Sequence, residues 1–338
     1  MDLNIIWFLL VGVLIIGYAI LDGFDLGVGM IHLFTKDENE KRVNLNAIGP
    51  VWDGNEVWLL TGGGALFAAF PIVYATVFSG FYLAFMLLLT ALIFRAVSFE
   101  FRKYSEVRNK KYWDFAFGIG SLLPALLFGV AIGNILRGLP IDSKGAYLGT
   151  FLELLNPYAI VVGLVSLTMF LMHGAIYLTL KSEGKQKEKM VKVANNAWIA
   201  FILLYLLATL MTFFYGHYLF VSLFSNPIFW ILLVLLFVSI IYIPIGLKTG
   251  KAGYTFTASS LTIALMILLM ALSLFPRLVP SSIDLSYSLT IYNASSTHRT
   301  LLTMLIIALI GVPIVIGYTI WMYRIFRGKV VIGKDSYV

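Results

Sequence analysis

The sequence contains no cysteine, only four histidines and few charged residues. Without cysteine there are no disulfides, thiolate nucleophiles or cysteine-ligated metal centres. Charged residues make up 12% of the 338 residues, about half of the share in a soluble domain. Hydrophobic residues make up 60%, and the mean hydropathy is +0.92. These values exclude an ordinary soluble protein and predict an integral membrane protein.

Long apolar runs recur from end to end of the chain. Runs of this length are typical of membrane-spanning helices, whereas the strands of a membrane barrel would show short alternating segments. We predict an all-α protein with nine transmembrane helices. The expected spans are residues 5–34, 51–74, 77–101, 113–136, 157–180, 195–218, 227–247, 255–275 and 300–323. No segment between them is long enough for a soluble domain, so residues 1–338 are expected to form a single polytopic membrane domain. The first run lacks a positive n-region and is expected to be a retained span.

The positions of the basic residues predict the orientation. With nine spans and the N-terminus outside, most of the lysines and arginines fall in loops on the inside. These inside residues are Lys36, Lys41, Arg42, Arg102, Lys103, Arg108, Lys110, Lys111, Lys181, Lys185, Lys187, Lys189, Lys192, Lys248, Lys251, Arg324, Arg327, Lys329 and Lys334. The outer side holds only Arg137, Lys144, Arg277 and Arg299. The sequence therefore predicts an N-out/C-in topology, and the net charge of +7 is a topology signal that needs no nucleic-acid partner.

Two carboxylates occur inside the first predicted span, in the stretch GYAILDGFDLGVG. Asp22 and Asp25 are three residues apart and share one helix face. Gly23 and Gly27 form a small-xxx-small pair, and Gly29 extends it. This pattern places the carboxylates against protein, where one of them could be protonated or neutralised by a basic partner. The alternative is that both are structural and hydrogen-bond a neighbouring helix.

The second polar stretch is GPVWDGNEVWLLTGGGALFAAFP, residues 49–71. It carries Asp53 and Glu56, flanked by Trp52 and Trp58, and continues through three consecutive glycines at 62–64. Ionisable groups at the edge of hydrocarbon are costly and usually face a bundle interior, a partner or water. We expect a polar, tightly packed seam here. The alternative is a re-entrant or interfacial loop whose acids face water.

The predicted topology brings these groups to one half of the membrane. Asp22, Asp25, Asp53 and Glu56 fall in the inner halves of the first two spans, and Arg95 lies near the inner end of the third. We expect the four acids to gather in a pocket enclosed by protein, with Arg95 as counter-charge for Asp22 or Asp25. Such a group could take up protons from the cytoplasm. A buried ion-pair cluster that fixes helix register would give the same pattern.

The histidines give little support for a haem in this chain. A haem bound within the spans needs axial ligands there, usually His or Met. Among the histidines only His173 is well placed for this, and a lone histidine within a membrane helix is more often a hydrogen-bonded contact. We therefore predict no metal or haem ligand set.

Several stretches together resemble subunit II of the cytochrome bd quinol oxidases. The two stretches above are followed in order by VFSGFYLAFMLLLTALIFRAVSFEFR, LFPRLVPSS and SLTIYNASS. The resemblance runs along the whole chain. It implies a fold of two four-helix bundles plus a peripheral helix, and an obligate complex with subunit I in a bacterial or archaeal cytoplasmic membrane.

The resemblance also implies a role in respiration. The complex oxidises quinol, reduces dioxygen to water and draws the protons from the cytoplasm, so it is electrogenic without pumping. Haems b558, b595 and d are expected in subunit I, with quinone as the substrate of the complex and no catalytic residue in this chain alone. In the family, the second aspartate of DGFD and the aspartate of WDGN are associated with the proton route; these are Asp25 and Asp53. Trp52 and Trp58 are candidate contacts for a quinone or lipid tail.

The sequence departs from the family pattern at two positions. Asn293 stands where some relatives have an aspartate, and His173 stands where others have an amide. The short outer loops leave room for a small accessory subunit. Two alternatives remain at this point. One is a secondary transporter with Asp22, Asp25, Asp53 and Arg95 as a coupling-ion site, and the other is a purely structural subunit.

Overall fold

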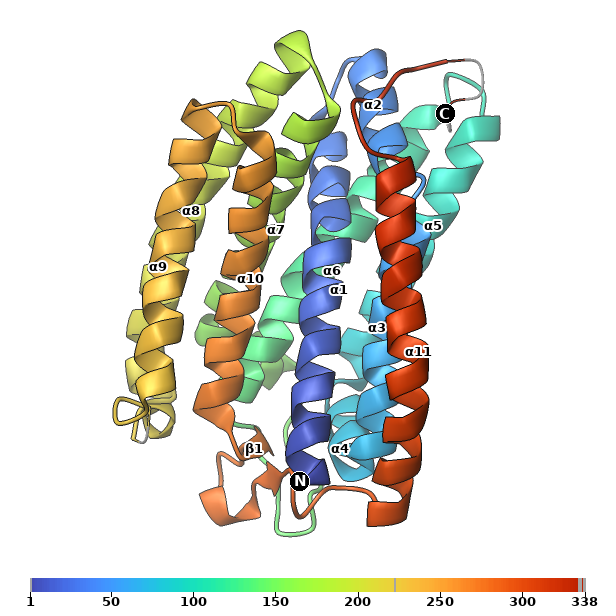
Figure 1. Ribbon diagram of the computed structural model, residues 1–338. Coiled ribbons are helices and arrows are strands. Elements are labelled where there is room, and N and C mark those ends of the chain that lie inside the picture. The colour runs from blue at the N-terminus through green and yellow to red at the C-terminus, as the bar shows by residue number, and fades with distance from the viewer. Residues whose placement is uncertain (1, 222, 334–335, 337–338) are drawn as a thin grey trace.

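Long helices that run alongside one another form most of the molecule (Figure 1). The computed structural model describes residues 2–221, 223–333 and 336. The long helices are α1 (Leu3–Phe34), α3 (Trp52–Ala69), α5 (Tyr82–Tyr104), α6 (Lys110–Arg137), α7 (Pro157–Lys181), α8 (Gly184–Tyr215), α9 (Pro227–Lys248), α10 (Ala252–Leu274) and α11 (His298–Ile325). The shorter elements are α2 (Glu38–Ile48), α4 (Pro71–Gly80), η1 (Leu152–Leu155), η2 (His217–Leu219), η3 (Leu285–Tyr287), β1 (Arg277–Val279) and β2 (Leu289–Thr290).

Several helices begin at capping residues that the sequence provides. Asn156 and Asn226 precede prolines that occupy the first turns of α7 and α9, and each asparagine side chain accepts a hydrogen bond from a backbone N–H of that turn. Thr297 caps α11 in the same way. A capping side chain satisfies an N–H that has no partner within the helix. A proline at the first helical position sacrifices no hydrogen bond, because the N–H it lacks would have had no partner within the helix. These caps fix where three of the apolar runs begin.

The prediction of a multi-pass helical membrane protein is confirmed. Among the described residues, eight helices are long and apolar enough to cross a membrane, and α3 with α4 passes the same test only as a pair bent by 120°. The predicted boundaries of most spans agree with the helices to within a few residues. The sixth is one exception, because α8 begins at Gly184 and takes up most of the polar segment expected as a loop.

The predicted second and third spans are wrong in extent. The expected span 51–74 ends at Ala69, and residues 71–80 form the separate helix α4. Pro71 causes the break, because it has no N–H for the helix and disfavours helical dihedrals in the residue before it. Phe70 accordingly leaves the helical region, with φ −133° and ψ 65°. The third span therefore begins at Tyr82 rather than at residue 77.

Helix α1 contacts α3, α6, α7 and α10, and its backbone packs directly against the backbone of α7. A Cβ atom built on Gly27 would lie 2.1 Å from the Phe170 carbonyl oxygen, and one built on Gly174 would lie 2.5 Å from the Gly27 backbone. Neither position admits a side chain, so the predicted small-residue surface is a true close contact. The expectation of a tight seam at the three glycines of α3 is not met within this chain. A Cβ atom on Gly62 would lie at an ordinary 3.7 Å from Leu14 Cβ, and Gly63 and Gly64 have no described atom within 4 Å of the Cβ position.

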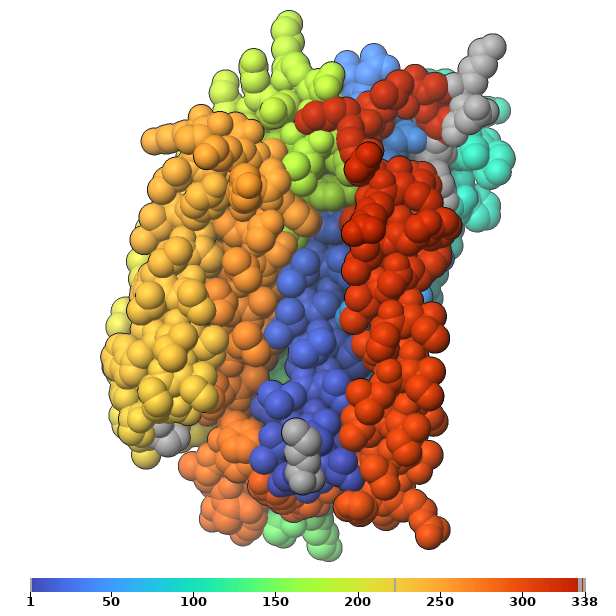
Figure 2. Space-filling model, viewed as in Figure 1, coloured from blue at the N-terminus to red at the C-terminus, as the bar shows by residue number. Residues whose placement is uncertain are grey.

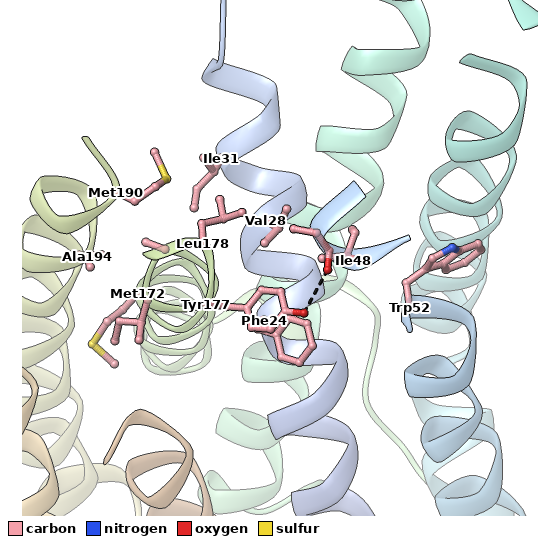
Figure 3. Close-up of a cluster of buried hydrophobic side chains, with 14 of the residues drawn as sticks. Phe24, Val28, Ile31, Ile48, Trp52, Met172, Tyr177, Leu178, Met190 and Ala194 are labelled. Carbon is pink, nitrogen blue, oxygen red and sulfur yellow. Dashed lines mark hydrogen bonds between the residues drawn. The ribbon is translucent and has the colours of Figure 1, made fainter. Parts of the chain in front are cut away.

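A cluster of buried apolar side chains lies where α1, α2 and α7 meet (Figure 3). The rings of Phe24 and Tyr177 stack with centroids 4.0 Å apart, and the Tyr177 hydroxyl donates to the Ala47 carbonyl oxygen over 3.0 Å. This hydrogen bond ties α2, which sequence reasoning did not predict, to α7.

Basic residues gather at the end of the molecule where α2, the α7–α8 and α9–α10 connections and the C-terminal segment lie (Figure 1). Lys334, which belongs to the predicted inner tail, lies outside the described residues. The opposite end holds the N-terminus and a small antiparallel hairpin in which Arg277 pairs with Thr290. This hairpin is a minor departure from the all-α prediction.

Helix α11 runs along the outside of the molecule beside α1 (Figure 2). Leu301 is its single buried residue. Such limited packing leaves a large apolar helix surface exposed in the isolated chain.

Candidate functional site

Asp22 and Arg95 form a buried ion pair between α1 and α5. Arg95 Nη1 donates to Asp22 Oδ2 over 3.0 Å, and Nη2 donates to Asp22 Oδ1 over 2.6 Å. Both side chains are at most 1% exposed. The two parallel hydrogen bonds are the strong bidentate geometry of arginine and carboxylate. A buried charge left without its partner would be costly, so removing either group would leave the other uncompensated.

Asp25 lies one helical turn further along α1 in a different environment. Its Oδ2 accepts a hydrogen bond of 2.7 Å from Asn55 Nδ2 on α3, and Asn55 Oδ1 accepts one of 3.0 Å from the Tyr323 hydroxyl on α11. Asp25 Oδ1 has no hydrogen-bond partner among the described residues, although the side chain is fully buried. A buried carboxyl oxygen without a donor is a place where a proton can be held.

The other two predicted acids lie further out on α3. Asp53 is exposed at the first turn, and Glu56 is half-buried. Asn55 faces α1, and residues two positions apart in a helix point in nearly opposite directions, so Asp53 is turned away from Asp25. The expectation of one enclosed pocket for all four acids is therefore wrong in this chain. Glu56 lies one turn after Asp53 on α3, next to Asn55 in the chain.

The two tryptophans of α3 occupy different places. Trp52 is buried, packs against Phe99 and has the Arg95 guanidinium 6.0 Å from its ring centroid. Trp58 lines an apolar pocket of about 380 Å³ between α1, α3 and α11, together with Gly64 of the glycine run. Only Trp58 is therefore placed to contact an apolar chain in that pocket.

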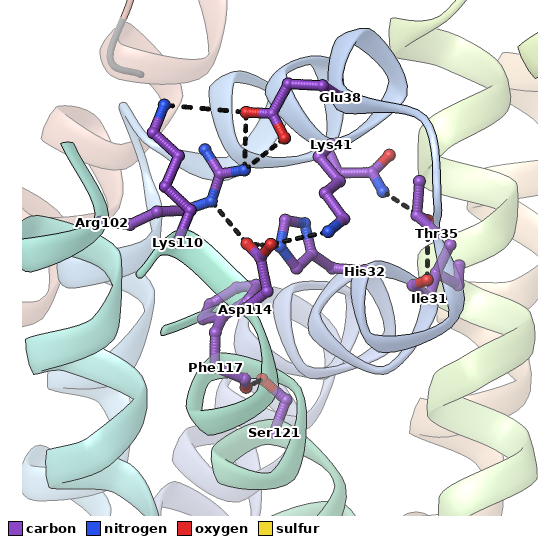
Figure 4. Close-up of polar contacts among 11 residues, drawn as sticks. Ile31, His32, Thr35, Glu38, Lys41, Arg102, Lys110, Asp114, Phe117 and Ser121 are labelled. Atoms are coloured by element: carbon purple, nitrogen blue, oxygen red, sulfur yellow. Dashed lines mark hydrogen bonds and ion pairs between the residues drawn. The ribbon is translucent and has the colours of Figure 1, made fainter. Parts of the chain in front are cut away.

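Sequence reasoning missed a second polar cluster, centred on Asp114 of α6 (Figure 4). Asp114 Oδ1 contacts His32 Nε2 at 2.7 Å and Arg102 Nε, and Asp114 Oδ2 accepts from Lys41 Nζ over 2.6 Å. Arg102 also donates to both oxygens of Glu38 on α2. The cluster joins the ends of α1, α5 and α6 to α2 and so fixes the shape of the basic end of the molecule.

The histidine that the sequence analysis weighed as a haem ligand is fully engaged in the protein. His173 Nδ1 lies 2.7 Å from Ser259 Oγ, and Nε2 lies 3.1 Å from the Ile20 carbonyl oxygen. Haem ligation would break one of these buried hydrogen bonds, so His173 does not fit an axial ligand. Among the described residues there is also no group of three or more His, Cys, Asp or Glu side chains that could hold a metal ion.

The fold and the site define a polytopic helical membrane protein with a carboxylate site buried between its helices. The sequence model of the family described as "Cytochrome bd terminal oxidase subunit II" matches residues 3–326. The chain belongs to this family, whose characterised members are subunits of an oxidoreductase complex of respiration.

Individual relatives agree with this assignment. The chain is 38% identical over 361 aligned residues to cytochrome bd-I ubiquinol oxidase subunit 2 of Escherichia coli K12, covering 97% of this chain and 95% of the relative. It is 39% identical to cytochrome bd ubiquinol oxidase subunit 2 of Bacillus subtilis 168, with 97% of each covered. A chain of the bd oxidase structure from Geobacillus thermodenitrificans has the same fold, with a TM-score of 0.82 at 19% identity over 96% of this chain and 99% of that one. Family membership favours the oxidase subunit over the secondary transporter.

Proposed function

We propose that this chain is the haem-free subunit II of a quinol-oxidising respiratory oxidase. In this role it supports a haem-bearing subunit I and supplies buried carboxyl groups for the uptake of protons from the cytoplasm. The Escherichia coli and Bacillus subtilis relatives are both named as ubiquinol oxidase subunits. These names support a quinol as the substrate of the complex. Reduction of dioxygen to water at haems b558, b595 and d of subunit I would consume the protons.

The arrangement that goes with this role is two bundles and a peripheral helix within one polytopic domain. Contacts among α1, α3, α5 and α6, and among α7, α8, α9 and α10, support the two bundles, and the sparse packing of α11 supports its peripheral place. The basic residues in the segments at the end that holds α2 support an N-out/C-in orientation in a bacterial or archaeal cytoplasmic membrane.

The observation that carries the proton role is the contrast between Asp22 and Asp25. Both oxygens of Asp22 accept hydrogen bonds from Arg95, which supplies its counter-charge. Asp25 has one oxygen free and lies fully inside the protein. Asp25 is therefore the group that receives and releases the proton, and the Asp22–Arg95 pair holds the neighbouring charge constant.

The route begins at the basic end of the molecule. Asp53 lies exposed at the first turn of α3, where water at the membrane surface would reach it, and the half-buried Glu56 follows one turn later. Glu56 is next to Asn55 on α3, and Asn55 Nδ2 donates to the buried Asp25 over 2.7 Å. A proton would therefore pass from Asp53 through Glu56 to Asp25, with bridging water between the groups. Trp58 would contact a lipid or quinone tail in the apolar pocket beside this route.

Two variants of the intact oxidase test the role. In Asp25→Asn, and to a smaller extent in Asp53→Asn, we expect unchanged haem content and oxygen consumption slowed by about tenfold or more, because a proton relay loses its exchangeable group. The measurements are the visible spectrum and the rate of oxygen uptake with quinol. Glu100→Gln serves as the control, since Glu100 is an exposed acid at the far end of α5. Normal assembly with unchanged turnover in Asp25→Asn would show that the acids are structural.

A further inference from the structure

The side-chain amide of Asn55 links the buried Asp25 to the peripheral helix α11. Asn55 Nδ2 donates both of its hydrogens, one to Asp25 Oδ2 over 2.7 Å and one to the Leu21 carbonyl oxygen over 3.2 Å. A carbonyl oxygen can only accept, so the nitrogen of this amide must face α1. The amide oxygen must then face Tyr323, and the tyrosine hydroxyl must donate to it.

This assignment fixes where Asp25 can carry a proton. Oδ2 accepts the Asn55 hydrogen bond, which leaves Oδ1 as the oxygen that a proton can occupy. Donation from Tyr323 polarises the Asn55 amide, which strengthens its hydrogen bond to the Asp25 carboxylate. Tyr323 therefore influences Asp25 without touching it.

Helix α11 is held near both of its ends, which fixes the Tyr323 hydroxyl in place. At one end Trp7 Nε1 donates to the Leu301 carbonyl oxygen over 2.9 Å. Beyond the other end, Lys329 Nζ donates to the carbonyl oxygens of Thr179 and Ser182, and Val330 N donates to that of Lys181. The tail thus fastens α11 to the C-terminal end of α7. Between these ties lies the apolar pocket of about 380 Å³.

We propose that Tyr323 is a positioning residue for the proton site: it sets the orientation and hydrogen-bond strength of Asn55, and through Asn55 it sets the proton affinity of Asp25. This inference rests on the proposed function of Asp25 and assigns a task to the peripheral helix. The titratable and charged groups within electrostatic range of Asp25 are Asp22 of α1, Glu56 of α3, Arg95 of α5, Tyr177 of α7 and Tyr323 of α11. Among these groups, Tyr323 is the one joined to Asp25 by hydrogen bonds through Asn55.

The test compares Tyr323→Phe with Tyr318→Phe in the intact oxidase. Tyr318 lies on the same helix, is 55% exposed and lacks a described polar partner, so its variant controls for removal of a hydroxyl from α11. In Tyr323→Phe the Asn55 amide loses its donor and the Asp25 carboxylate is less stabilised. We expect the alkaline limb of oxygen consumption to move to higher pH by about half a unit. No movement is expected in Tyr318→Phe.

Infrared difference spectra give a readout that is independent of turnover. The carboxyl or carboxylate bands of Asp25, identified by their loss in Asp25→Asn, should shift in Tyr323→Phe and stay in place in Tyr318→Phe. In an Asn55→Ala background the Tyr323→Phe change should have no further effect, because the link is gone. A shift that persists without Asn55, or that Tyr318→Phe reproduces, would overturn the inference.

The outcomes separate this inference from the proposed function. If Asp25→Asn slows turnover and Tyr323→Phe moves neither the pH profile nor the bands, Tyr323 has no positioning role and the proton function stands. If Asp25→Asn leaves turnover unchanged, the proton function fails, and a band shift in Tyr323→Phe alone still supports the positioning of Asp25.

Discussion

Asp22 and Asp25 share one face of α1, yet their partners give them different chemistry. Arg95 occupies both oxygens of Asp22, whereas Asn55 occupies one oxygen of Asp25. An arginine stays charged under all physiological conditions, so Asp22 has a permanent counter-charge. An amide carries no charge and leaves its partner free to exchange a proton. The chemical difference between the two acids therefore comes from residues on α3 and α5.

The ion pair predicts a large loss of stability when one partner is removed. Arg95→Gln would leave Asp22 buried without a counter-charge, and we expect a loss of about 3–5 kcal/mol. The melting temperature and the haem content of the purified complex measure it. The double variant Arg95→Gln with Asp22→Asn should lose less than the two single variants combined, since no charge remains unpaired. Unchanged melting in Arg95→Gln would mean that the pair contributes nothing to the fold.

Sequence alone located the acids and Arg95 as their counter-charge, but it did not locate Asn55 and Tyr323 as partners. Asp22, Asp25 and Arg95 stand out because ionisable residues are rare within apolar runs. Asn55 and Tyr323 are ordinary polar residues that are 268 positions apart, and only the folded chain brings them together. Asp114 was missed because it follows two lysines at the start of an apolar run, where it resembles a charge in contact with water.

At the scale of helices, the length of an apolar run predicted that a helix forms there, but it did not predict where the chain bends. The runs that became α7, α9 and α11 have clear starts at Asn156, Asn226 and Thr297, and their bounds agree with the predicted spans to within a few residues. The run from residue 51 to 74 is equally apolar, but Pro71 turns the chain. Hydropathy does not depend on dihedral angles, so it cannot report a bend.

The crossing of α1 and α7 predicts a sharp difference between two glycines of one helix. Gly27→Ala would place a methyl group against the α7 backbone, and we expect destabilisation of about 1–3 kcal/mol or more from overpacking. Gly12→Ala is the matched control, because no described atom lies within 4 Å of its Cβ position. Thermal denaturation of the two variants in detergent measures the difference. Equal melting temperatures would show that α1 and α7 can separate without cost.

At the scale of the whole molecule, the division of labour between two subunits can be tested by spectroscopy. His173 is bonded at both ring nitrogens, and His32 is engaged by Asp114. We therefore expect this chain, purified without subunit I, to show no Soret band, while the complex shows the full haem spectrum. A stable haem in the isolated chain would contradict the haem-free assignment.

The pairing of Asp22 with Arg95 also bears on how the membrane voltage acts on this region. The pair has no net charge, so an electric field across the bilayer exerts little net force on it. A proton that arrives at Asp25 carries a full charge, and moving one charge through 100 mV changes its energy by about 2.3 kcal/mol. If the route runs inward from Asp53, the voltage acts mainly on that travelling proton while the fixed charges beside it stay balanced.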